Sequence, residues 1–460
     1  ELQYYKLWKS VGTELEDRYT KEIRLKLMDY VSQQPSFLHQ LNFEWTDVRD
    51  NLKDNEAAIE FINLYGITPE NIENPEDMDP CIGALILRKD MDYPVFVRLA
   101  SNAVIDSLMS AEDGSMIPDA LYSGKVKETV YNLIWSPLSP YLDGVQSIFY
   151  APTGYLQHIN VDWLGQYDDD FLANHYNLYR VSSTRTLIKK NRDNDSANAI
   201  ILGDIAYSTK NKQFEDTPQS KYRSITRSGF GPLSGTINEI DSISSTLTSH
   251  SFSNTVLSKS LADEQSVRKL SRKSPKILHF ATHGFYYTNE ELEEEFKKSS
   301  YMGFQINRSE LYHSGLALAG AQDTWYNEKP GSEINFDKYF SMDAASDGIL
   351  LSSEISELDF SNTDLVVLSA CQTALGYVKS EGVYGLHEAF KLAGVNSLIM
   401  SLWKVDDDAT QLLMTSFYKN LMNGMPKREA LINAQKEVRE TPGFNDPYNW
   451  AAFILLDGQD

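Results

Sequence analysis

The sequence is poor in cysteine, with only Cys81 and Cys371 among its 460 residues. Two thiols can form neither a disulfide framework nor a four-cysteine metal site. Long apolar runs are also missing: nothing approaches the roughly 18 to 20 residues of a membrane-spanning helix, and residues 1–20 lack the apolar core of a signal peptide. We therefore expect a cytoplasmic protein without a membrane partner.

Positive charge is scarce as well. Lys and Arg together number 42 and Asp and Glu number 65, so the formal net charge is −23. Such an excess of negative charge repels the phosphates of nucleic acids and of anionic lipid surfaces. The composition therefore argues against nucleic acid as a partner.

The pattern of apolar residues divides the chain into three parts. Residues 1–50 carry Leu, Ile and Tyr at helical spacing, which predicts helices that end a preceding helical region. Residues 51–190 contain short β-branched runs typical of strands, and the polar segment 189–199 separates them from a second α/β region at residues 195–460. Because the chain begins with Glu1 rather than methionine, we expect a missing N-terminal region through which an activating protein would bind.

Strands and helices alternate along the second region. The runs ILHFA, LVVLS and SLIMS are almost purely apolar, as in strands that are covered on both faces. Thr236 and Glu239, three positions apart, fit a capping pattern that opens one of the helices. We therefore predict an α/β fold with a mostly parallel sheet flanked by helices, and an acidic, Ser- and Asn-rich insert over residues 285–347.

Two of the apolar runs end in residues that carry chemistry. ILHFATHG ends at His283 and Gly284, and DLVVLSAC ends at Cys371. The carboxyl ends of strands in an open α/β sheet share one edge, so an imidazole and a thiol would meet there. A thiol attacks a carbonyl carbon as the thiolate, and the imidazole takes its proton and later protonates the leaving amine. The backbone N–H groups of Gly284 and Cys371 are the candidate oxyanion donors.

Structural roles compete with each of these assignments. A lone cysteine after an apolar strand is more often a small core residue than a nucleophile, so Cys371 by itself does not indicate catalysis. His279 lies four residues before His283 and is a rival base, but its apolar neighbours in the strand favour a buried, hydrogen-bonded histidine. No histidine is near Cys81 in the sequence, and we assign this cysteine to packing.

A cluster of carboxylates follows the run NSLIMSLW. Trp403 ends this run, and Asp406, Asp407 and Asp408 stand at the start of the next predicted helix. One carboxylate at such a position caps the helix, because the helix N-terminus favours negative charge. The alternative is an acidic pocket for a basic substrate side chain, with Asp406 as the first candidate, followed by Asp408 and Trp403. The sequence leaves both interpretations open.

Other chemical motifs are incomplete. HEAFK at His387 has Lys391 where a second zinc-binding histidine would stand. GFGPLSG near Gly229 contains Pro232 and does not directly follow a strand, so it predicts a turn rather than a dinucleotide-binding loop. We therefore expect neither a metal nor a cofactor.

Eight segments of the chain resemble one family in sequence and in order. Upstream they are SIFYAPTGYLQHINVDWL and NLYRVSSTRTL; downstream they are ILHFATHGF, SGLALAG, DGILLSSEISELDF, DLVVLSACQTALG, EGVYGLHEAFKLAGVNSLIMSLWKVDDDAT and DPYNWAAFILLDG. The family is the CHAT domain, a group of caspase-like and separase-like peptidases. The resemblance implies a caspase-like fold with a degenerate first lobe and a dyad of His283 and Cys371. SACQT departs from the caspase signature, so a specificity for aspartate is not carried over.

The same resemblance implies an activity. It points to a cysteine endopeptidase that cleaves a dedicated protein substrate in bacterial signalling or defence, such as a pore-forming, gasdermin-like protein. The enzyme would be held inactive until a partner binds or until the insert after Phe285 is cut. The alternative is a catalytically silent protein that keeps the caspase-like fold as a scaffold for protein partners.

Overall fold

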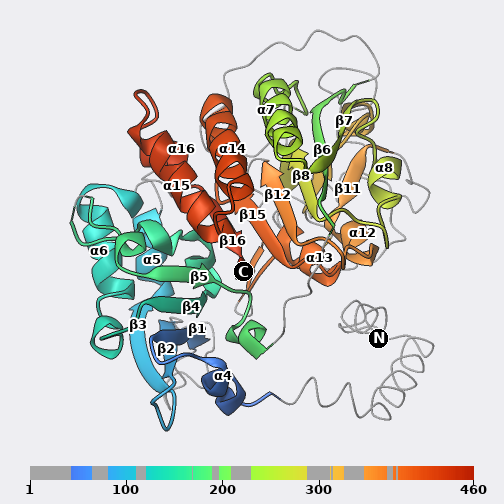
Figure 1. The fold of residues 1–460 in the computed structure, drawn as a ribbon. Helices are drawn as coiled ribbons and strands as arrows, with labels where there is room; N and C mark the ends of the chain where they lie inside the picture. Colours follow the sequence, from blue (N-terminus) through green and yellow to red (C-terminus); the bar gives the residue numbers. More distant parts are fainter. Residues whose placement is uncertain are drawn as a thin grey trace, which may run out of the picture.

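In the computed structural model, one large mixed sheet carries helices on both faces (Figure 1). The structure describes residues 43–64, 81–109, 121–167, 169–188, 196–208, 229–286, 311, 314–325, 347–369, 377–379 and 382–459. The helical region expected over residues 1–50 lies mostly outside these ranges, and its described end contains helix α4 (Trp45–Asn51).

Eleven strands of the described residues form one sheet. From edge to edge they are β3 (Val95–Ser101), β2 (Cys81–Arg88), β1 (Glu56–Leu64), β4 (Ser147–Ala151), β5 (Asn177–Arg180), β16 (Phe453–Leu456), β15 (Ser397–Ser401), β12 (Leu365–Ser369), β8 (Ile277–Ala281), β6 (Asn198–Ile205) and β7 (Ser253–Lys259). Neighbours run parallel except at β3–β2, β2–β1 and β16–β15. The predicted mostly parallel sheet is confirmed.

The apolar runs of the sequence form three adjacent inner strands of this sheet, β15, β12 and β8. Every residue of β8, β12 and β15 is buried, as expected for strands that are covered on both faces. The edge strand β3 instead alternates between exposed and partly buried residues over most of its length. The most apolar strands are therefore those covered on both faces.

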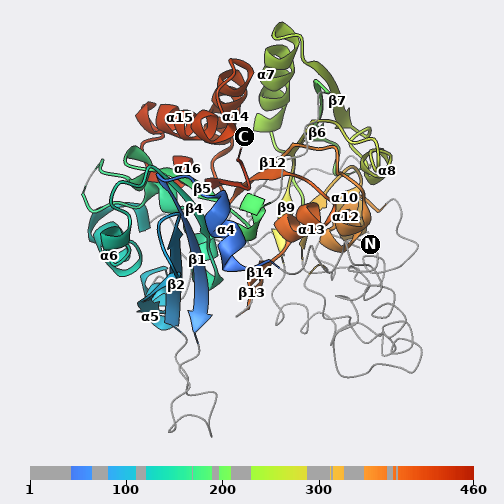
Figure 2. The ribbon, with the colours of Figure 1, turned by 60° about the horizontal axis from the view of Figure 1, so that its bottom comes forward.

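Helices cover both faces of the sheet. Figure 2 shows α7 (Gly235–Ser249), α14 (Asp407–Met422) and α15 (Lys427–Glu440) on one side, with α12 (Ser352–Glu357) and α13 (Leu386–Leu392) on the other. Helix α7 buries Ile240, Ile243 and Leu247, which share one helical face. Gly203 of β6 allows this close contact, because a Cβ atom there would lie 2.5 Å from the Ile240 side chain.

The start of α7 differs from the expected capping pattern. Its N-cap residue is Ser234, which makes no side-chain cap hydrogen bond. The Thr236 hydroxyl donates to the carbonyl of Leu233 at 2.8 Å and accepts from the N–H of Asp204 at 3.1 Å. Glu239 bonds to a side chain of β8 instead of turning back to the helix end. The capping prediction was wrong because both side chains find partners elsewhere in the fold.

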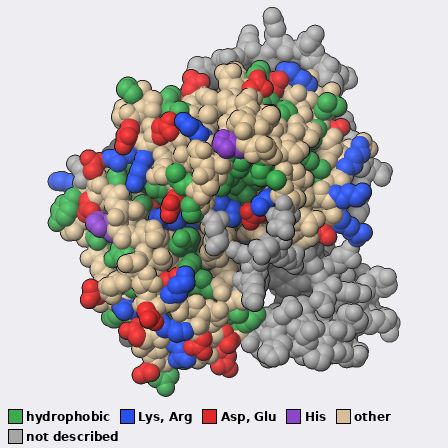
Figure 3. All heavy atoms as spheres, in the orientation of Figure 1, with side chains coloured by type: hydrophobic (Ala, Val, Ile, Leu, Met, Phe, Trp, Pro, Cys, Tyr) green, Lys and Arg blue, Asp and Glu red, His purple; other side chains and the backbone are tan. Residues whose placement is uncertain are grey.

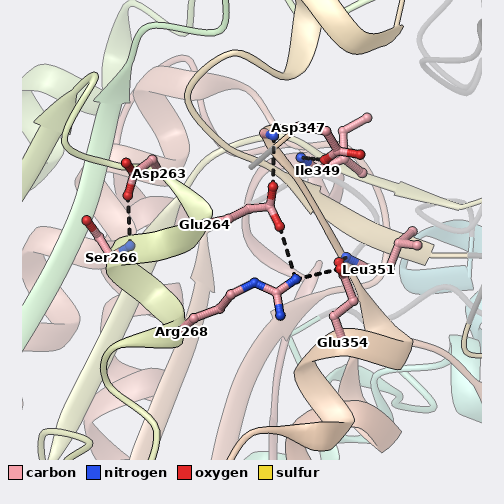
Figure 4. A network of polar contacts seen from close by, with 9 residues as sticks. Asp263, Glu264, Ser266, Arg268, Asp347, Ile349, Leu351 and Glu354 are labelled. Carbon is pink, nitrogen blue, oxygen red and sulfur yellow. Dashed lines mark hydrogen bonds and ion pairs between the residues drawn. The ribbon is translucent and has the colours of Figure 1, made fainter. Parts of the chain in front are cut away.

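A second, antiparallel sheet contains β9 (Gly284–Tyr286) at the start of the predicted insert, β10 (Ser314–Ala317) within it and β11 (Ile349–Leu351) directly after it. A polar network holds this sheet to α8 (Glu264–Arg268) (Figure 4). Glu264 accepts a hydrogen bond from the N–H of Gly348 at 2.9 Å, and Arg268 pairs with Glu264 at 3.4 Å and with Glu354 at 2.6 Å. The insert is therefore anchored at both ends beside the end of β8.

Strands from residues 51–190 and from residues 195–460 belong to the same sheet. They meet where β16 lies between β5 and β15. Near this joint the Asn160 side-chain amide donates to the carbonyls of Ala451 and Phe453, each at 2.9 Å, and Arg428 pairs with Asp162 at 3.1 Å. One hydrophobic core extends through both parts.

The remaining elements are short. They are α5 (Asn102–Met109), α6 (Gly124–Ile134), α10 (Ala321–Trp325), α16 (Pro447–Trp450), β13 (Tyr377–Lys379), β14 (Gly382–Tyr384), and the 3-10 helices η3 (Ser139–Tyr141), η4 (Gly154–His158), η5 (Val161–Trp163), η6 (Leu172–Asn174) and η7 (Thr184–Ile188). Within the described ranges, no helix is both long enough and apolar enough to cross a membrane. Acidic and basic side chains are interspersed over the face shown in Figure 3.

Candidate active site

The strand register aligns the residues that precede the two predicted catalytic positions. Strands β8 and β12 are parallel neighbours, and Ala281 pairs with Ser369. The alignment continues one residue further, because the N–H of Thr282 donates to the carbonyl of Ser369 at 3.3 Å. His283 stands two residues after Ala281, and Cys371 stands two residues after Ser369. Cys371 itself lies outside the described residues.

His283 is held in one orientation by the loop before α7. Its Nε2 atom lies 2.7 Å from the carbonyl oxygen of Gly231. Its ring packs against Tyr207 and Phe230, with ring centroids 4.9 and 5.7 Å away. A carbonyl only accepts hydrogen bonds, so Nε2 carries the hydrogen and the neutral ring presents the Nδ1 lone pair. The ring therefore has the tautomer of a base that works through Nδ1.

The protonation state of His283 also suits a base. Burial lowers its pKa to about 4, the Gly231 carbonyl opposes this shift, and the charge of Lys404 adds to it. At neutral pH the imidazole is therefore uncharged and able to accept a proton. The Gly231 carbonyl is a functional group that sequence reasoning missed: GFGPLSG predicted a turn, but a backbone acceptor leaves no signature in residue type.

The backbone around His283 is fixed on both sides. The Thr282 hydroxyl, in a residue that is 1% exposed, donates to the Ala317 carbonyl, and the Tyr207 hydroxyl lies 3.0 Å from it. After the histidine, the N–H of Ala317 donates to the His283 carbonyl at 2.9 Å, and Gly284 pairs with Leu316 in β9 and β10. The segment from Thr282 to Gly284 thus joins the large sheet to the insert sheet.

His279 has the structural role that its position in the strand predicts. It is fully buried, with its Nε2 atom 3.0 Å from Glu239 Oε1 and its Nδ1 atom 3.1 Å from the Tyr418 hydroxyl. Both ring nitrogens are occupied, so this histidine is not free to act as the base for a thiol. Cys81 is likewise buried, in β2.

A small cavity, partly open to solvent, lies at the carboxyl ends of β8, β12 and β15. Its lining comprises Leu233, Gly235, Thr236, Glu239, Thr282, Ser369, Ser401, Val405, Asp407, Thr410 and Phe453. Thr282 directly precedes His283, and Ser369 stands two residues before Cys371. The cavity lining therefore includes residues that closely precede both predicted catalytic positions in the sequence.

Three polar side chains give this cavity its chemistry. Glu239 is only 2% exposed. Ser369 is 6% exposed, and its Oγ atom has no hydrogen-bond partner in the described structure. Burial raises the pKa of Asp407; the nearby charges of Asp406, Glu239 and Asp408 raise it further, while Lys404 lowers it. The cavity therefore contains two carboxylates and a hydroxyl with unused hydrogen-bonding capacity, which suits a cationic guest.

The three predicted substrate-binding residues do not line this cavity. Asp406 is the N-cap of α14 and accepts from the N–H groups of Asp408 and Ala409 at 3.0 and 3.2 Å. Asp408 is exposed. Trp403 is buried, and its Nε1–H donates to the Tyr448 carbonyl at 2.9 Å. Asp407, the middle member of the cluster, is the one that lines the cavity.

The described residues contain no group of three or more His, Cys, Asp or Glu residues able to hold a metal ion. His387 stands in α13, where its sequence motif had the wrong spacing for zinc. Glu239 is the residue of the site that sequence reasoning missed. A carboxylate in an amphipathic helix looks like a solvated or capping residue, and only the packing of α7 on the sheet shows that it is buried.

Curated relatives match a limited part of the chain. The chain is 35% identical to tetratricopeptide repeat protein 28 of Mus musculus over 108 residues, which is 24% of this chain and 4% of the relative. It is 38% identical to tetratricopeptide repeat protein 28 of Homo sapiens over 92 residues, which is 20% of this chain and 4% of the relative. The matched stretches thus span only a small fraction of these relatives' own length.

Solved structures and a family model complete the comparison. The structure is similar to the Arg-specific cysteine proteinase gingipain R, with a TM-score of 0.36 and 9% identity over 75% of this chain and 68% of that one. It is also similar to the Saccharomyces cerevisiae separase–securin complex, with a TM-score of 0.47 and 9% identity over 99% of this chain and 32% of that one. The family model of the CHAT domain matches residues 125–459, and the chain therefore belongs to the CHAT domain family.

Proposed function

We propose that this protein is a cysteine endopeptidase in which Cys371 is the nucleophile and His283 the base. The observation that supports the proposal is the register of β8 and β12, which pairs Ala281 with Ser369; His283 and Cys371 each follow one of these residues by two positions in the sequence. The uncharged imidazole of His283, with its Nε2–H bound to the Gly231 carbonyl, supports the assignment. Membership of the CHAT domain family agrees with it.

In the proposed reaction, Nδ1 of His283 takes the proton of the Cys371 thiol as the sulfur attacks the scissile carbonyl carbon. The backbone N–H groups of Gly284 and Cys371 stabilise the oxyanion. The imidazolium then gives its proton to the leaving amine, which departs with the new N-terminus and leaves a thioester on Cys371. Water, deprotonated by the same imidazole, hydrolyses the thioester and restores the thiol.

The cavity beside the dyad is the proposed pocket for the side chain that precedes the cut. Its carboxylates, Glu239 and Asp407, favour a basic side chain, and Glu239 most strongly, because it is buried and a buried carboxylate without a cation is costly. The proposal transfers the acidic pocket of the sequence analysis from Asp406, which caps α14, to its neighbour Asp407. Neither Asp408 nor Trp403 contributes to the cavity lining.

The biological setting is proposed from the family. We propose a cytoplasmic enzyme in bacterial signalling or defence that cleaves one dedicated protein, such as a gasdermin-like protein, and binds neither nucleic acid nor membrane. A tetratricopeptide repeat region preceding the chain, as in the names of its relatives, would bind the activating partner. The insert after Phe285, anchored through β9 and β11, is the proposed activation segment.

Two measurements test the activity. A thiol-reactive peptide probe is expected to label the wild type and Cys81→Ala but not Cys371→Ala, because the buried Cys81 is chemically inert. Mapping of new protein N-termini in a bacterial lysate is expected to show cuts with the wild type that are absent with Cys371→Ala or His283→Ala. Labelling that does not depend on Cys371, together with no new N-termini, would favour the catalytically silent scaffold.

A further inference from the structure

Glu239 lies on the second turn of α7, beside the cavity. Its residue is 2% exposed, and it lines the cavity with Ser369 and Asp407. Its helix cannot move away easily, because Ile240 packs against the space left free by Gly203 of β6. A carboxylate in this position is fixed by the packing of the fold, unlike one on a surface loop.

Two buried side chains continue inward from Glu239. His279 of β8 is 0% exposed, and its Nε2 atom lies 3.0 Å from Glu239 Oε1. Its Nδ1 atom lies 3.1 Å from the hydroxyl of Tyr418 in α14, a residue that is also 0% exposed. Burial and the charge of Glu239 raise the pKa of Tyr418 well above its ordinary value, so its hydroxyl keeps its hydrogen.

These contacts satisfy one another when Nε2 of His279 carries a hydrogen. The Tyr418 hydroxyl donates to Nδ1 of His279, and the Nε2–H of His279 donates to Glu239. A carboxylate that accepts this bond through Oε1 keeps Oε2 for another donor. Within the described structure, His279 is the hydrogen-bond partner of Glu239, and the cavity is the remaining direction from which a donor would come.

We propose that Glu239 is the residue that sets the preference of the pocket for a cationic side chain, and that His279 is a positioning residue which, together with Tyr418, fixes the Glu239 carboxylate. This inference rests on the proposed peptidase function. It gives a role to His279, which the proposed reaction does not use, and it assigns the specificity of the pocket to helix α7 rather than to the carboxylate cluster at α14.

The position of Glu239 explains why it outweighs Asp407. Asp407 is an exposed residue at the rim, and Lys404 partly offsets its charge. Solvent screens the charge of an exposed carboxylate. A buried carboxylate has lost its water of hydration, so it interacts strongly with a cationic guest, and a neutral guest does not compensate for the lost water. Ser369 adds a hydroxyl without a partner, 6% exposed, as a second acceptor for the guest.

Two peptides test the charge assignment. Both span a cleavage site mapped for the wild type, one with arginine and one with its neutral isostere citrulline before the cut. Glu239→Gln keeps the acceptor for His279 and removes the charge, so its kcat/KM for the arginine peptide is expected to fall about 100-fold. For the citrulline peptide, kcat/KM of Glu239→Gln is expected to change by less than about threefold. Asp407→Asn is the matched control at the rim, and it is expected to lower kcat/KM for the arginine peptide by less than about tenfold.

The positioning role needs a separate measurement. His279→Gln is expected to raise KM for the arginine peptide and to leave its kcat nearly unchanged. Both constants for the citrulline peptide are expected to stay nearly unchanged. In a Glu239→Gln background the same substitution is expected to have no further effect, because the group that it positions has lost its charge. Tyr418→Phe removes one hydroxyl only. If His279→Gln does not fold, the double-mutant cycle is made with Tyr418→Phe and Glu239→Gln instead.

Equal losses of kcat/KM for the arginine and citrulline peptides would overturn the inference. Additive effects in the double-mutant cycle would also overturn it, and either result would assign these residues a purely structural role. Cleavage that depends on Cys371 but shows no preference for arginine over citrulline would also overturn it, and would leave the proposed peptidase function intact. Absence of any cleavage that depends on Cys371 would instead refute the proposed function itself.

Discussion

A pH-dependent stability is expected from the carboxyl group of Glu264, at the start of α8 (Figure 4). The side chain is fully buried and accepts from the N–H of Gly348 at 2.9 Å. Burial raises its pKa from the ordinary 4.5 to about 7; the charge of Asp347 raises it further, while the Gly348 N–H and Arg268 oppose the shift. Glu354 completes the network by pairing with Arg268 at 2.6 Å.

The sign of the effect follows from proton binding. Between pH 4.5 and 7 the folded protein holds a proton on Glu264 that the unfolded chain has lost, so stability falls as the pH rises through this window. The shift corresponds to about 3 kcal/mol, fully present below pH 4.5 and lost above pH 7. For 460 residues the unfolding entropy is about 1 kcal/mol per degree, so the expected change in Tm is about 3 °C.

Glu264→Gln isolates this contribution, because glutamine keeps the acceptor for Gly348 and cannot ionise. Thermal melting of the wild type and the variant between pH 4.5 and 9 is expected to give similar Tm values at the acid end. The variant is expected to become about 3 °C more stable by pH 8. Glu357→Gln, on the exposed side of α12, is the matched control and is expected to follow the wild type. A difference between Glu264→Gln and the wild type that does not change with pH would refute the reasoning.

Two further predictions concern the site. Because burial holds the pKa of His283 at about 4, activity is expected to stay level as the pH falls and to decline only near pH 4, in contrast to the ordinary histidine value of 6.5. Lys404→Met removes a charge that lowers this pKa, so it is expected to move the decline to higher pH; a decline near pH 6.5 in the wild type would contradict the assignment. Asp406→Ala removes the N-cap of α14 and is expected to cost about 1 kcal/mol of stability, with Asp408→Ala as the exposed control. The preference for arginine over citrulline is expected to persist in Asp406→Ala. Loss of this preference would assign the charge recognition in the pocket to Asp406.

The periodicity of apolar residues and the positions of the strand ends predicted most of the fold. Buried strands such as β8 and β12 were readable because they are short, purely apolar and separated by helical patterns. The position of His283 at the end of β8 followed from the same pattern. The continuity of the sheet across the polar segment 189–199 could not be read, because β16, from the end of the chain, inserts beside β5 and completes the sheet by a contact between distant residues.

The chemistry of the site was readable only in part. The cluster of three aspartates indicated a cap and an acidic pocket, and the structure separates these between Asp406 and Asp407, because the residue that precedes the helix has the geometry of a cap. Glu239 fitted a local capping pattern that its tertiary partner His279 overrides. The Gly231 carbonyl could not have been found at all, since every residue has one.

The most direct test of the central claim is a disulfide between the two predicted catalytic positions. In a Cys81→Ala background, His283→Cys adds a thiol two residues after Ala281, and Cys371 stands two residues after Ser369, the register partner of Ala281. A disulfide between them needs a Cα separation of about 4.4 to 6.8 Å. After mild oxidation, mass spectrometry is expected to find residues 283 and 371 linked within one chain, whereas His279→Cys, buried within β8, remains unlinked. Two free thiols in the oxidised His283→Cys protein would contradict the proximity on which the proposed peptidase depends.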